Sequence, residues 1–249
     1  MYSTSLSDAE WACLQRHLPP VRVRGRRRIY PLREILDAIF YLLRSGCPWR
    51  LLPRDFPPWQ VVYYHFRRFH LRAAERERVG RQPQPTAAIV DSQSVKTVGE
   101  SACISGYDGH KRIKGRKRHL LVDTLGLPLS IFVTPADMHD QVGARCLLAG
   151  LGPLVPRLKK IWADGAYAGE PLATWCRERG GWDLEIVERE AGGHSFSVLP
   201  RRWVVERTFG WLVRNRRLRI DYERRVQTSE ALMQVATIRL LVSRLAKGA

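Results

Sequence analysis

The sequence predicts an α/β protein in which a mixed β-sheet is flanked by helices and preceded by a small all-helical amino-terminal domain. Residues 1 to about 80 show helical spacing of apolar residues and no strand-like alternation. After a polar linker at 79–86, short strand-like runs alternate with helical segments. The 249 residues, 45% of them hydrophobic, can bury one main core and a small satellite. We therefore expect one domain at 1–80 and a second at 87–249.

The amino-terminal region is predicted to contain two main helices. The first begins at Pro31, which suits a first helical turn, and ends at Ser45-Gly46. Its apolar positions are Leu32, Ile35, Leu36, Ile39, Phe40 and Leu43. The second begins near 57–58, and its apolar stripe contains Trp59, Val62, Tyr63, Phe66 and Phe69. Two interpretations stay open: a helix-turn-helix-like DNA reader, and a helical bundle that packs on the main domain.

The elements of the main domain follow in order along the chain. A buried strand at 87–91 precedes a hairpin of two strands at 117–123 and 129–134. A helix at 141–148, a strand at 160–164, a helix at 170–177 and a strand at 184–188 come next. Two helices at about 202–216 and 229–247 complete the chain. A hairpin followed by alternating strands and helices predicts the mixed sheet.

The charge of the chain favours a nucleic-acid partner. There are 42 Lys and Arg residues against 24 Asp and Glu, a formal charge of +18. The basic residues gather at 22–28, 111–118 and 201–225, although any one cluster could be an ordinary solvated face. The candidate DNA-binding residues are Arg26, Arg27, Arg28, Lys111, Arg112, Lys114, Arg116, Lys117, Arg202, Arg207 and Arg214.

Cysteine usage and hydropathy indicate a cytoplasmic protein. The five cysteines are odd in number, far apart and free of any C-x-x-C pair, which argues against a disulfide framework and a zinc site. The amino terminus has no charged and apolar regions of a signal peptide. The longest apolar stretch, 35–43, is interrupted by Asp37 and is too short to span a bilayer. We expect neither export nor a membrane partner.

Three acidic residues are the candidate catalytic and metal-binding residues. Asp91 ends the strand at 87–91, where open α/β sheets place their ligands, and Ser92 and Ser94 are expected in the loop beyond. Asp164 ends the next strand, and Glu206 lies in an arginine-rich helix. Each also has a structural interpretation: a turn or cap at Asp91, a hairpin turn at Asp164 and helix ion pairs at Glu206.

These acids suit a pair of Mg²⁺ ions. Two ions roughly 3.5–4 Å apart stabilise the attacking and leaving oxygens of a displacement at phosphorus. Mg²⁺ prefers carboxylate and water oxygens, so three acids without His or Cys are the expected ligands, and Mn²⁺ is expected to substitute. Arg202, Arg207 and Arg214 lie to either side of Glu206 on the helix and suit phosphate groups. Gly210, one turn on, leaves room for a substrate to approach.

Other acids compete for these roles. Asp123, followed by Thr-Leu-Gly, is the strongest rival, but a turn-starting role suits it better. Asp137, His139 and Asp140 have ligand-like spacing. We interpret Asp140 mainly as a cap for the helix that follows, with contact of His139 to metal or DNA as the alternative.

Several segments together resemble the DDE transposases of bacterial insertion sequences, specifically the insertion-sequence-five-like group. The segments are SGCPWRLLP, DSQSVKT, GYDGHKRIKGRKRHLLVDTLGLPL, TPADMHD, ADGAYAG and RRWVVERTFGWLVRNRRLRIDYE, and they extend over nearly the whole chain. The resemblance implies an RNase H-like catalytic domain with Asp91, Asp164 and Glu206 as the metal-binding triad. In the related signature of Tyr, two residues, Arg, three residues, Glu, six residues and Lys, only Arg202 and Glu206 match. Leu199 and Val213 occupy the Tyr and Lys positions, with Arg214 beside the latter.

The resemblance also implies a reaction. A transposase binds the terminal inverted repeats of its element, cleaves a strand at each end and transfers the 3′-hydroxyl to target DNA. Because two ends are handled together, a homodimer or larger synaptic assembly on double-stranded DNA is expected, in the cytoplasm and associated with the nucleoid. The alternatives are a metal-dependent nuclease without joining activity and a non-catalytic, basic DNA-binding regulator.

Overall fold

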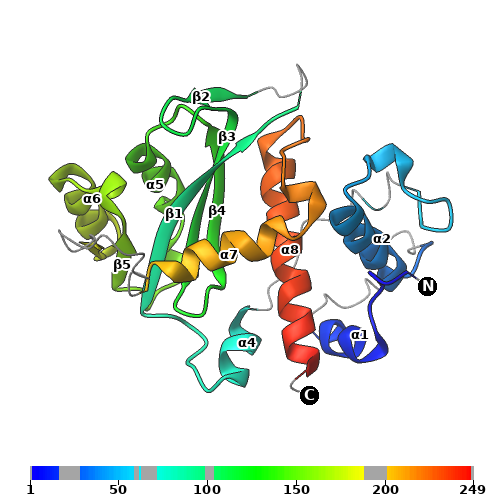
Figure 1. Ribbon diagram of the computed structural model, residues 1–249. Helices are drawn as coiled ribbons and strands as arrows, with labels where there is room; N and C mark the ends of the chain where they lie inside the picture. The colour runs from blue at the N-terminus through cyan, green and yellow to red at the C-terminus, as the bar shows by residue number, and fades with distance from the viewer. Residues whose placement is uncertain are drawn as a thin grey trace, which may run out of the picture.

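A mixed, six-stranded β-sheet forms the centre of the protein. The computed structural model describes residues 2–16, 29–58, 62, 72–98, 104–187 and 201–247. The strands are β1 (Ala87–Lys96), β2 (Gly106–Asp108), β3 (Ile113–Asp123), β4 (Pro128–Pro135), β5 (Lys160–Ala163) and β6 (Asp183–Ile186). Their order is β2-β3-β1-β5-β6, and β4 also pairs with β3 (Figure 1).

The direction of the strands divides the sheet into two halves. Strand β3 is antiparallel to both β1 and β4, whereas β5 runs parallel to β1 and β6 runs parallel to β5. Strand β2 pairs with the first residues of β3, and β4 pairs with the rest of the same edge. The predicted mixed sheet and its hairpin are confirmed.

Helices cover both faces of the sheet. Helices α5 (Asp140–Leu148) and α6 (Glu170–Gly180) pack on one face, and α7 (Trp203–Val213) and α8 (Val226–Lys247) lie on the other (Figure 1). The amino-terminal helices are α1 (Asp8–Gln15), α2 (Leu32–Ser45) and α4 (Arg72–Arg78). Short 3₁₀ turns are η1 (Trp49–Leu51), η2 (Gly152–Leu154), η3 (Gly165–Tyr167) and η4 (Arg216–Leu218).

Strand alternation creates a hydrophobic core on each face. On β1, Ile89 belongs to the core beneath α7 and α8, whereas Ala88 and Val90 belong to the core beneath α5 and α6. On β3, Leu121 likewise lies in the second core, opposite to its two neighbours. Because successive side chains point to opposite faces, a residue two positions after Ile89 faces α7. That residue is Asp91.

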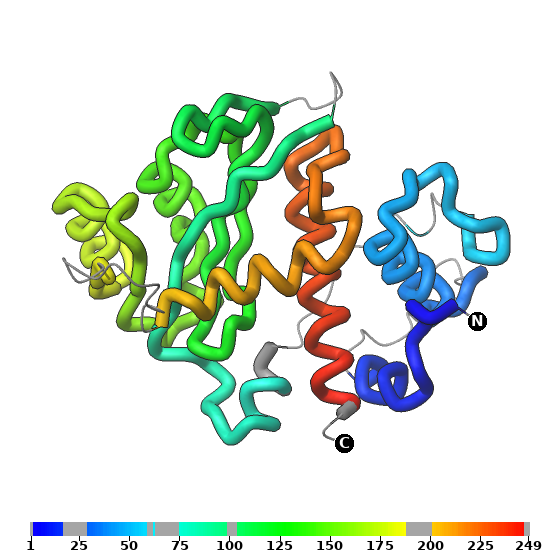
Figure 2. Tube along the Cα trace, in the orientation of Figure 1, coloured from blue at the N-terminus to red at the C-terminus, as the bar shows by residue number. Residues whose placement is uncertain are grey.

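Helix α8 connects the sheet with the amino-terminal helices. Figure 2 shows α8 between the sheet and the pair α1 and α2, and α8 contacts all three. Near the carboxyl end of α8, Ser243 donates a hydrogen bond of 2.9 Å to Glu10 of α1, and Arg239 forms a 3.0 Å ion pair with the same carboxylate. Leu14 and Val242 are fully buried in the core that also contains Ile89. The described amino-terminal helices thus share a core with the sheet.

Several element boundaries differ from those expected. Helix α2 is confirmed and ends as predicted, with Gly46 in the left-handed region at φ 76°. Most of the predicted helix after 57–58 lies outside the described residues, and only Val62 of its stripe is described, as buried. Strand β1 extends five residues beyond Asp91, so Ser92 and Ser94 lie in the strand and not in a loop.

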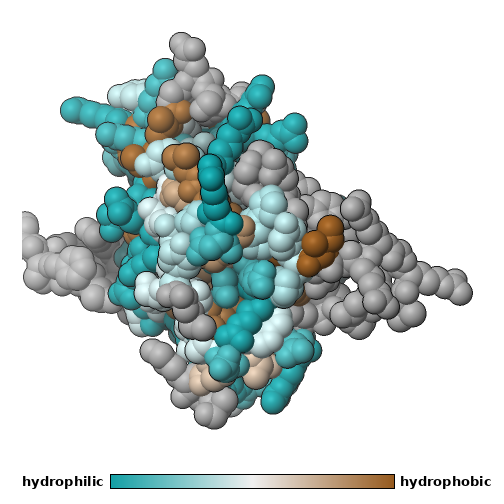
Figure 3. Space-filling view, turned by 90° about the vertical axis from the view of Figure 1, so that its right-hand side faces the viewer, coloured by the Kyte–Doolittle hydropathy of each residue, from teal (hydrophilic) through white to brown (hydrophobic). Residues whose placement is uncertain are grey.

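The surface on the side of α1 and α2 is largely hydrophilic. Among the described residues visible there, hydrophobic ones form small separate areas (Figure 3). None of the described helices combines the length and the apolar character that a membrane span requires.

Candidate active site

Asp91 lies within β1 on the face covered by α7. The strand continues past it, and Asp91 pairs with Leu120 of β3. The expectation that Asp91 ends its strand is therefore wrong, although its neighbour β5 does end near this level. Its carboxylate accepts a hydrogen bond of 2.7 Å from the backbone of Ser92. Pairing with β3 fixes the backbone at this position.

Asp164 follows β5 directly and caps the 3₁₀ turn η3. Its side chain accepts a hydrogen bond of 3.0 Å from Ala166 N. Strands β1 and β5 are parallel with Ile89 opposite Trp162, so two residues further along Asp91 is at the level of Asp164. Both acids belong to the sheet face of Ile89 and Trp162. The parallel register thus places the two aspartates on neighbouring strands and on one face.

Glu206 reaches this face from the first turn of α7. The helix is anchored to the turn between β3 and β4, where Thr208 donates a hydrogen bond of 2.9 Å to Gly126 O. The Glu206 side chain is 58% exposed. With Asp91 it lines a cavity of about 280 Å³. The other lining residues are Ser92, Gln93, Ser94, Lys111 and Phe209.

The guanidinium of Arg202 lies between the carboxylates of Asp164 and Glu206. Its Nη2 is 3.3 Å from Asp164 Oδ2 and 3.5 Å from Glu206 Oε1. Among the described residues, no group of three His, Cys, Asp or Glu side chains is close enough to hold a metal ion. Arg202 therefore contacts Asp164 and Glu206, and Glu206 shares the adjoining cavity with Asp91. A cation that took up all three carboxylates would have to displace this guanidinium.

Burial penalises the charge of Asp91. It raises the pKa of this carboxyl group from its ordinary 3.8 to about 6, and the negative charge of Asp164 adds to the increase. Electrostatic coupling between the two aspartates agrees with their positions on neighbouring strands. A cation at this point would relieve the penalty, which fits carboxylates that bind metal.

The side chains of Arg207 and Arg214 do not lie where contacts to phosphate groups beside Glu206 were expected. Arg207 lies 4.4 Å from the ring centres of both Trp203 and Trp211 and donates a hydrogen bond of 3.0 Å to Leu125 O. Burial and the nearby charge of another arginine lower its pKa. Arg214 is exposed at the carboxyl end of α7, about 12 Å along the helix from Glu206. Of the three arginines predicted around Glu206, only Arg202 forms an ion pair with it.

The basic cluster at 111–118 is split between surface and interior. Lys111, Arg112 and Lys114 are exposed, and Lys111 lines the cavity with Asp91 and Glu206. Arg116 is fully buried and forms a 3.1 Å ion pair with Asp221. Its other hydrogen bonds go to backbone carbonyl groups of 104, 223 and 224.

Lys117 is buried as well. Its ammonium donates to Met138 O at 2.8 Å and forms a 3.3 Å ion pair with Asp140. The expectation that Arg116 and Lys117 face DNA is corrected, because both charges are satisfied inside the protein. Arg26, Arg27, Arg28 and Leu199 lie outside the described residues.

The rival acids have structural roles. Asp123 is buried, accepts hydrogen bonds of 2.9 Å from the backbone of Leu125 and Leu127, and pairs with Arg76 at 2.6 Å. Its predicted role in the turn is confirmed. Asp140 is not a helix cap: it is the first residue of α5 and accepts a hydrogen bond of 2.6 Å from Ser92 on the opposite face of β1. Asp137 packs against Gly106.

Sequence reasoning missed Asp108, at the end of β2. This buried carboxylate accepts hydrogen bonds from Ser94 Oγ at 2.5 Å and from the backbone of His110 and Lys111 at 3.1 and 2.9 Å. The Asp108-Gly109 pair is a hairpin signal that could have revealed the turn between β2 and β3.

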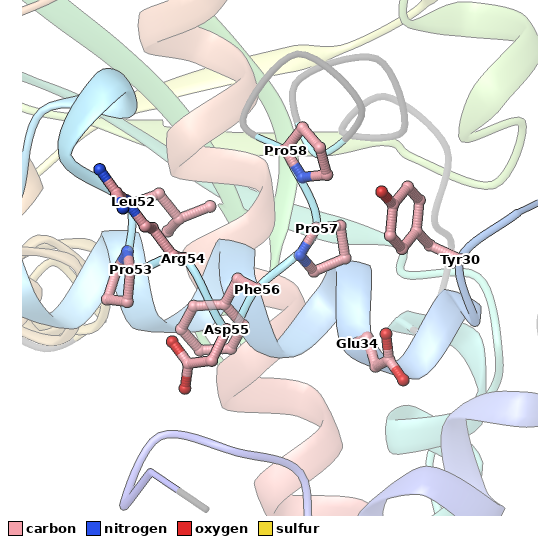
Figure 4. Close-up of a pocket in the computed structure, with 9 residues that line it drawn as sticks. All are labelled: Tyr30, Glu34, Leu52, Pro53, Arg54, Asp55, Phe56, Pro57 and Pro58. Carbon is pink, nitrogen blue, oxygen red and sulfur yellow. The ribbon is translucent and has the colours of Figure 1, made fainter.

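A second cavity of about 440 Å³ lies far from the acids. Figure 4 shows it between the start of α2, with Tyr30 and Glu34, and the loop at 52–58. None of the three candidate acids lines it. Its lining of prolines, aromatic rings and single charges does not bring together groups for phosphoryl chemistry. The smaller cavity next to Asp91 is therefore the candidate active site.

The fold and the site define a class of protein. The antiparallel strands β1, β3 and β4, followed in the chain by the parallel strands β5 and β6, have an RNase H-like arrangement. The candidate acids lie on β1, directly after β5 and on the crossing helix α7. The chain belongs to the family described as "Transposase DDE domain", whose model matches residues 82–241. A second model, "Putative transposase of IS4/5 family", matches residues 6–86. The resemblance to insertion-sequence transposases is confirmed.

One curated relative supports the same assignment. The "Putative transposase for insertion sequence element IS402" of Burkholderia cepacia is 31% identical over 129 residues. The alignment covers 49% of this chain and 60% of the relative, so the chain spans about three fifths of that protein. DDE transposases as a family are metal-dependent and act on DNA.

Proposed function

We propose that the protein is the transposase of an insertion sequence. It binds the terminal inverted repeats of its element, hydrolyses a strand at each end and directs the freed 3′-hydroxyl into target DNA. The observation that supports this most directly is the cavity shared by Asp91 and Glu206, with Asp164 at the same level of the sheet, in a chain of the DDE family.

Asp91, Asp164 and Glu206 would hold the catalytic cations, which we propose to be two Mg²⁺ ions that Mn²⁺ can replace. Carboxylate oxygens are the ligands these ions prefer, and the raised pKa of Asp91 indicates a place where a cation is favourable. When bound, such ions stabilise negative charge at the phosphoryl group and help to form the nucleophile.

The other residues of the site bind and orient the substrate. Arg202 forms ion pairs with both Asp164 and Glu206 in the free protein. We propose that it exchanges this contact for a DNA phosphate when cations and substrate enter, since a guanidinium binds either kind of oxygen. Until cations are bound, Arg202 would stay with the carboxylates, and the DNA would not be brought against carboxylates whose charge is unbalanced.

DNA recognition uses more of the chain than the site. We propose that residues 1–80 form the module that reads the inverted repeat, and that Arg26, Arg27, Arg28 and the exposed Arg112, Lys114 and Arg214 contact the DNA backbone. Because both ends of the element take part in one reaction, we propose a homodimer in the synaptic complex. In the cell, such a protein would be found on the nucleoid.

A strand-cleavage assay tests the proposal. The substrate is labelled duplex from the DNA that flanks the gene, and wild type is compared with Glu206→Gln with and without Mg²⁺. Because the amide is a poor ligand, the variant should lose cleavage by at least about 10²-fold and keep its DNA affinity. Glu178→Gln, which removes an exposed carboxylate of α6, is the matched control and should cleave normally.

The other outcomes distinguish the alternatives. Cleavage at the repeat boundary followed by a joined product supports the transposase. Cleavage that ignores the repeat and never joins identifies a nuclease. Binding without any cleavage, whatever the cation, identifies a regulator, and normal cleavage by Glu206→Gln removes Glu206 from the site.

A further inference from the structure

We propose that Lys111 is a phosphate-binding residue of the catalytic cavity and that Asp108 is the positioning residue that holds it there. The inference rests on the proposed function and deepens it. It assigns a new role to the turn at 109–112 between β2 and β3, which presents its lysine to the DNA phosphate at the reacting bond.

Lys111 is the basic member of the described residues that line this cavity. Its neighbours there include the carboxylates of Asp91 and Glu206. Arg214 lies at the far end of α7, and Val213 carries no charge. The ammonium of Lys111 is therefore placed to meet the substrate, where a compact charge binds a non-bridging phosphate oxygen.

Asp108 determines where the turn lies. Its carboxylate accepts the backbone N–H groups of His110 and Lys111 and the hydroxyl of Ser94. Ser94 is three residues from Asp91 on the same strand. A single buried carboxylate thus joins the backbone of Lys111 to the strand that carries Asp91.

The turn has a conformation that needs such support. Arg112, directly after Lys111, has φ 54°, a left-handed conformation that is unfavourable for a residue with a side chain. Hydrogen bonds from Asp108 to the two preceding residues offset this cost. Backbone strain at a turn that enters the cavity is consistent with a positioning role.

The test is single-turnover cleavage with enzyme in excess over DNA. Lys111→Ala should slow cleavage by about 10²-fold while DNA affinity changes by only a few-fold, because the lost charge acts at the reacting phosphate. Lys159→Ala is the matched control: it removes an equal charge from an exposed position just before β5, and Lys159 does not line the cavity. It should leave both the cleavage rate and the DNA affinity unchanged. Lys111→Arg should recover part of the rate.

The positioning role is tested by coupling. Asp108→Ala should slow cleavage like Lys111→Ala, and the double variant should be no slower than Lys111→Ala alone. Ser94→Ala removes one of the three hydrogen bonds and should give a smaller defect, which covers the case in which Asp108→Ala does not fold. The inference would be overturned if the two rate reductions multiplied in the double variant, or if Lys111→Ala cleaved DNA at the wild-type rate. Wild-type cleavage that depends on Glu206 tests the proposed function separately.

Discussion

The carboxyl group of Asp91 is surrounded by protein that disfavours its charge, and this gives metal binding a pH dependence. With a pKa of about 6, Asp91 is protonated below that pH in the metal-free protein. A cation must then displace the proton, so affinity for Mn²⁺ should fall by about tenfold per pH unit below pH 6 and level off above pH 7. Calorimetric titration of the DNA-free protein at pH 5, 6, 7 and 8 measures this.

Ionisation of Asp91 affects the free energy of unfolding in the opposite direction to metal affinity. Since the folded pKa lies above the ordinary 3.8, the folded metal-free protein binds more protons than the unfolded chain between about pH 4 and 6. Ionisation of Asp91 therefore lowers the free energy of unfolding as pH rises through this window. Asp91→Asn should remove that contribution together with the pH-dependent binding. An Mn²⁺ affinity that stays constant from pH 5 to 7 would contradict the assignment.

Arg116 illustrates a charge that maintains the fold. Its guanidinium and the Asp221 carboxylate are both buried, so Arg116→Met leaves an uncompensated charge and should lower the free energy of unfolding by about 3–5 kcal/mol. Lys114→Met, two residues away and exposed, should change it by less than about 0.5 kcal/mol. Urea denaturation gives both values. Equal stability of the two variants would show that Arg116 is not held in the interior.

At the scale of elements, two helical glycines should respond differently to one methyl group. A Cβ at Gly143 of α5 would lie 2.1 Å from the ring of His119, so Gly143→Ala should destabilise by about 1–3 kcal/mol. A Cβ at Gly210 of α7 would meet nothing within 4 Å, so Gly210→Ala should stabilise the protein by up to about 1 kcal/mol. Thermal denaturation compares them.

The functional effect of Gly210→Ala carries separate information. If DNA approaches Glu206 over this part of α7, the variant should bind the repeat more weakly although it is more stable. Similar melting temperatures for both glycine variants would contradict the close packing of α5 on β3.

The sequence predicts elements well where their apolar pattern is local. The helix at α2, the hairpin of β3 and β4, and the turn at Asp123 follow from neighbouring residues. The length of β1 could not be predicted, because its polar residues Ser92 and Ser94 are satisfied by Asp140 and Asp108, whose positions depend on the folded sheet. Pairing of distant residues is not visible in a local pattern.

The same limit applies to the basic cluster at 111–118. Arg116 finds its carboxylate more than a hundred residues along the chain, so a run of basic residues looks like surface in the sequence. The three acids were recognisable from their position relative to strands and helix, whereas Arg202 between two of them and Lys111 beside the third needed the tertiary arrangement.

At the scale of the whole molecule, one core includes the amino-terminal helices and α8. A fragment that begins at residue 82 would expose the apolar face of α8 that packs against α1 and α2. We expect this fragment to be poorly soluble and to unfold without a cooperative transition, whereas the full chain unfolds cooperatively. Gel filtration and thermal denaturation of the two chains test this. A soluble fragment with a sharp transition would support two independent domains.

The contact between Glu10 and Ser243 has a consequence for synthesis on the ribosome. Asp91 and Asp164 leave the ribosome before Glu206, and α8, which completes the core around α1, leaves after Glu206. A nascent or prematurely ended chain lacks both the third carboxylate and the partner of its first helix. The three candidate acids can therefore come together only after Glu206 has been translated, and the core shared by α1 and α8 can close only after α8 has followed.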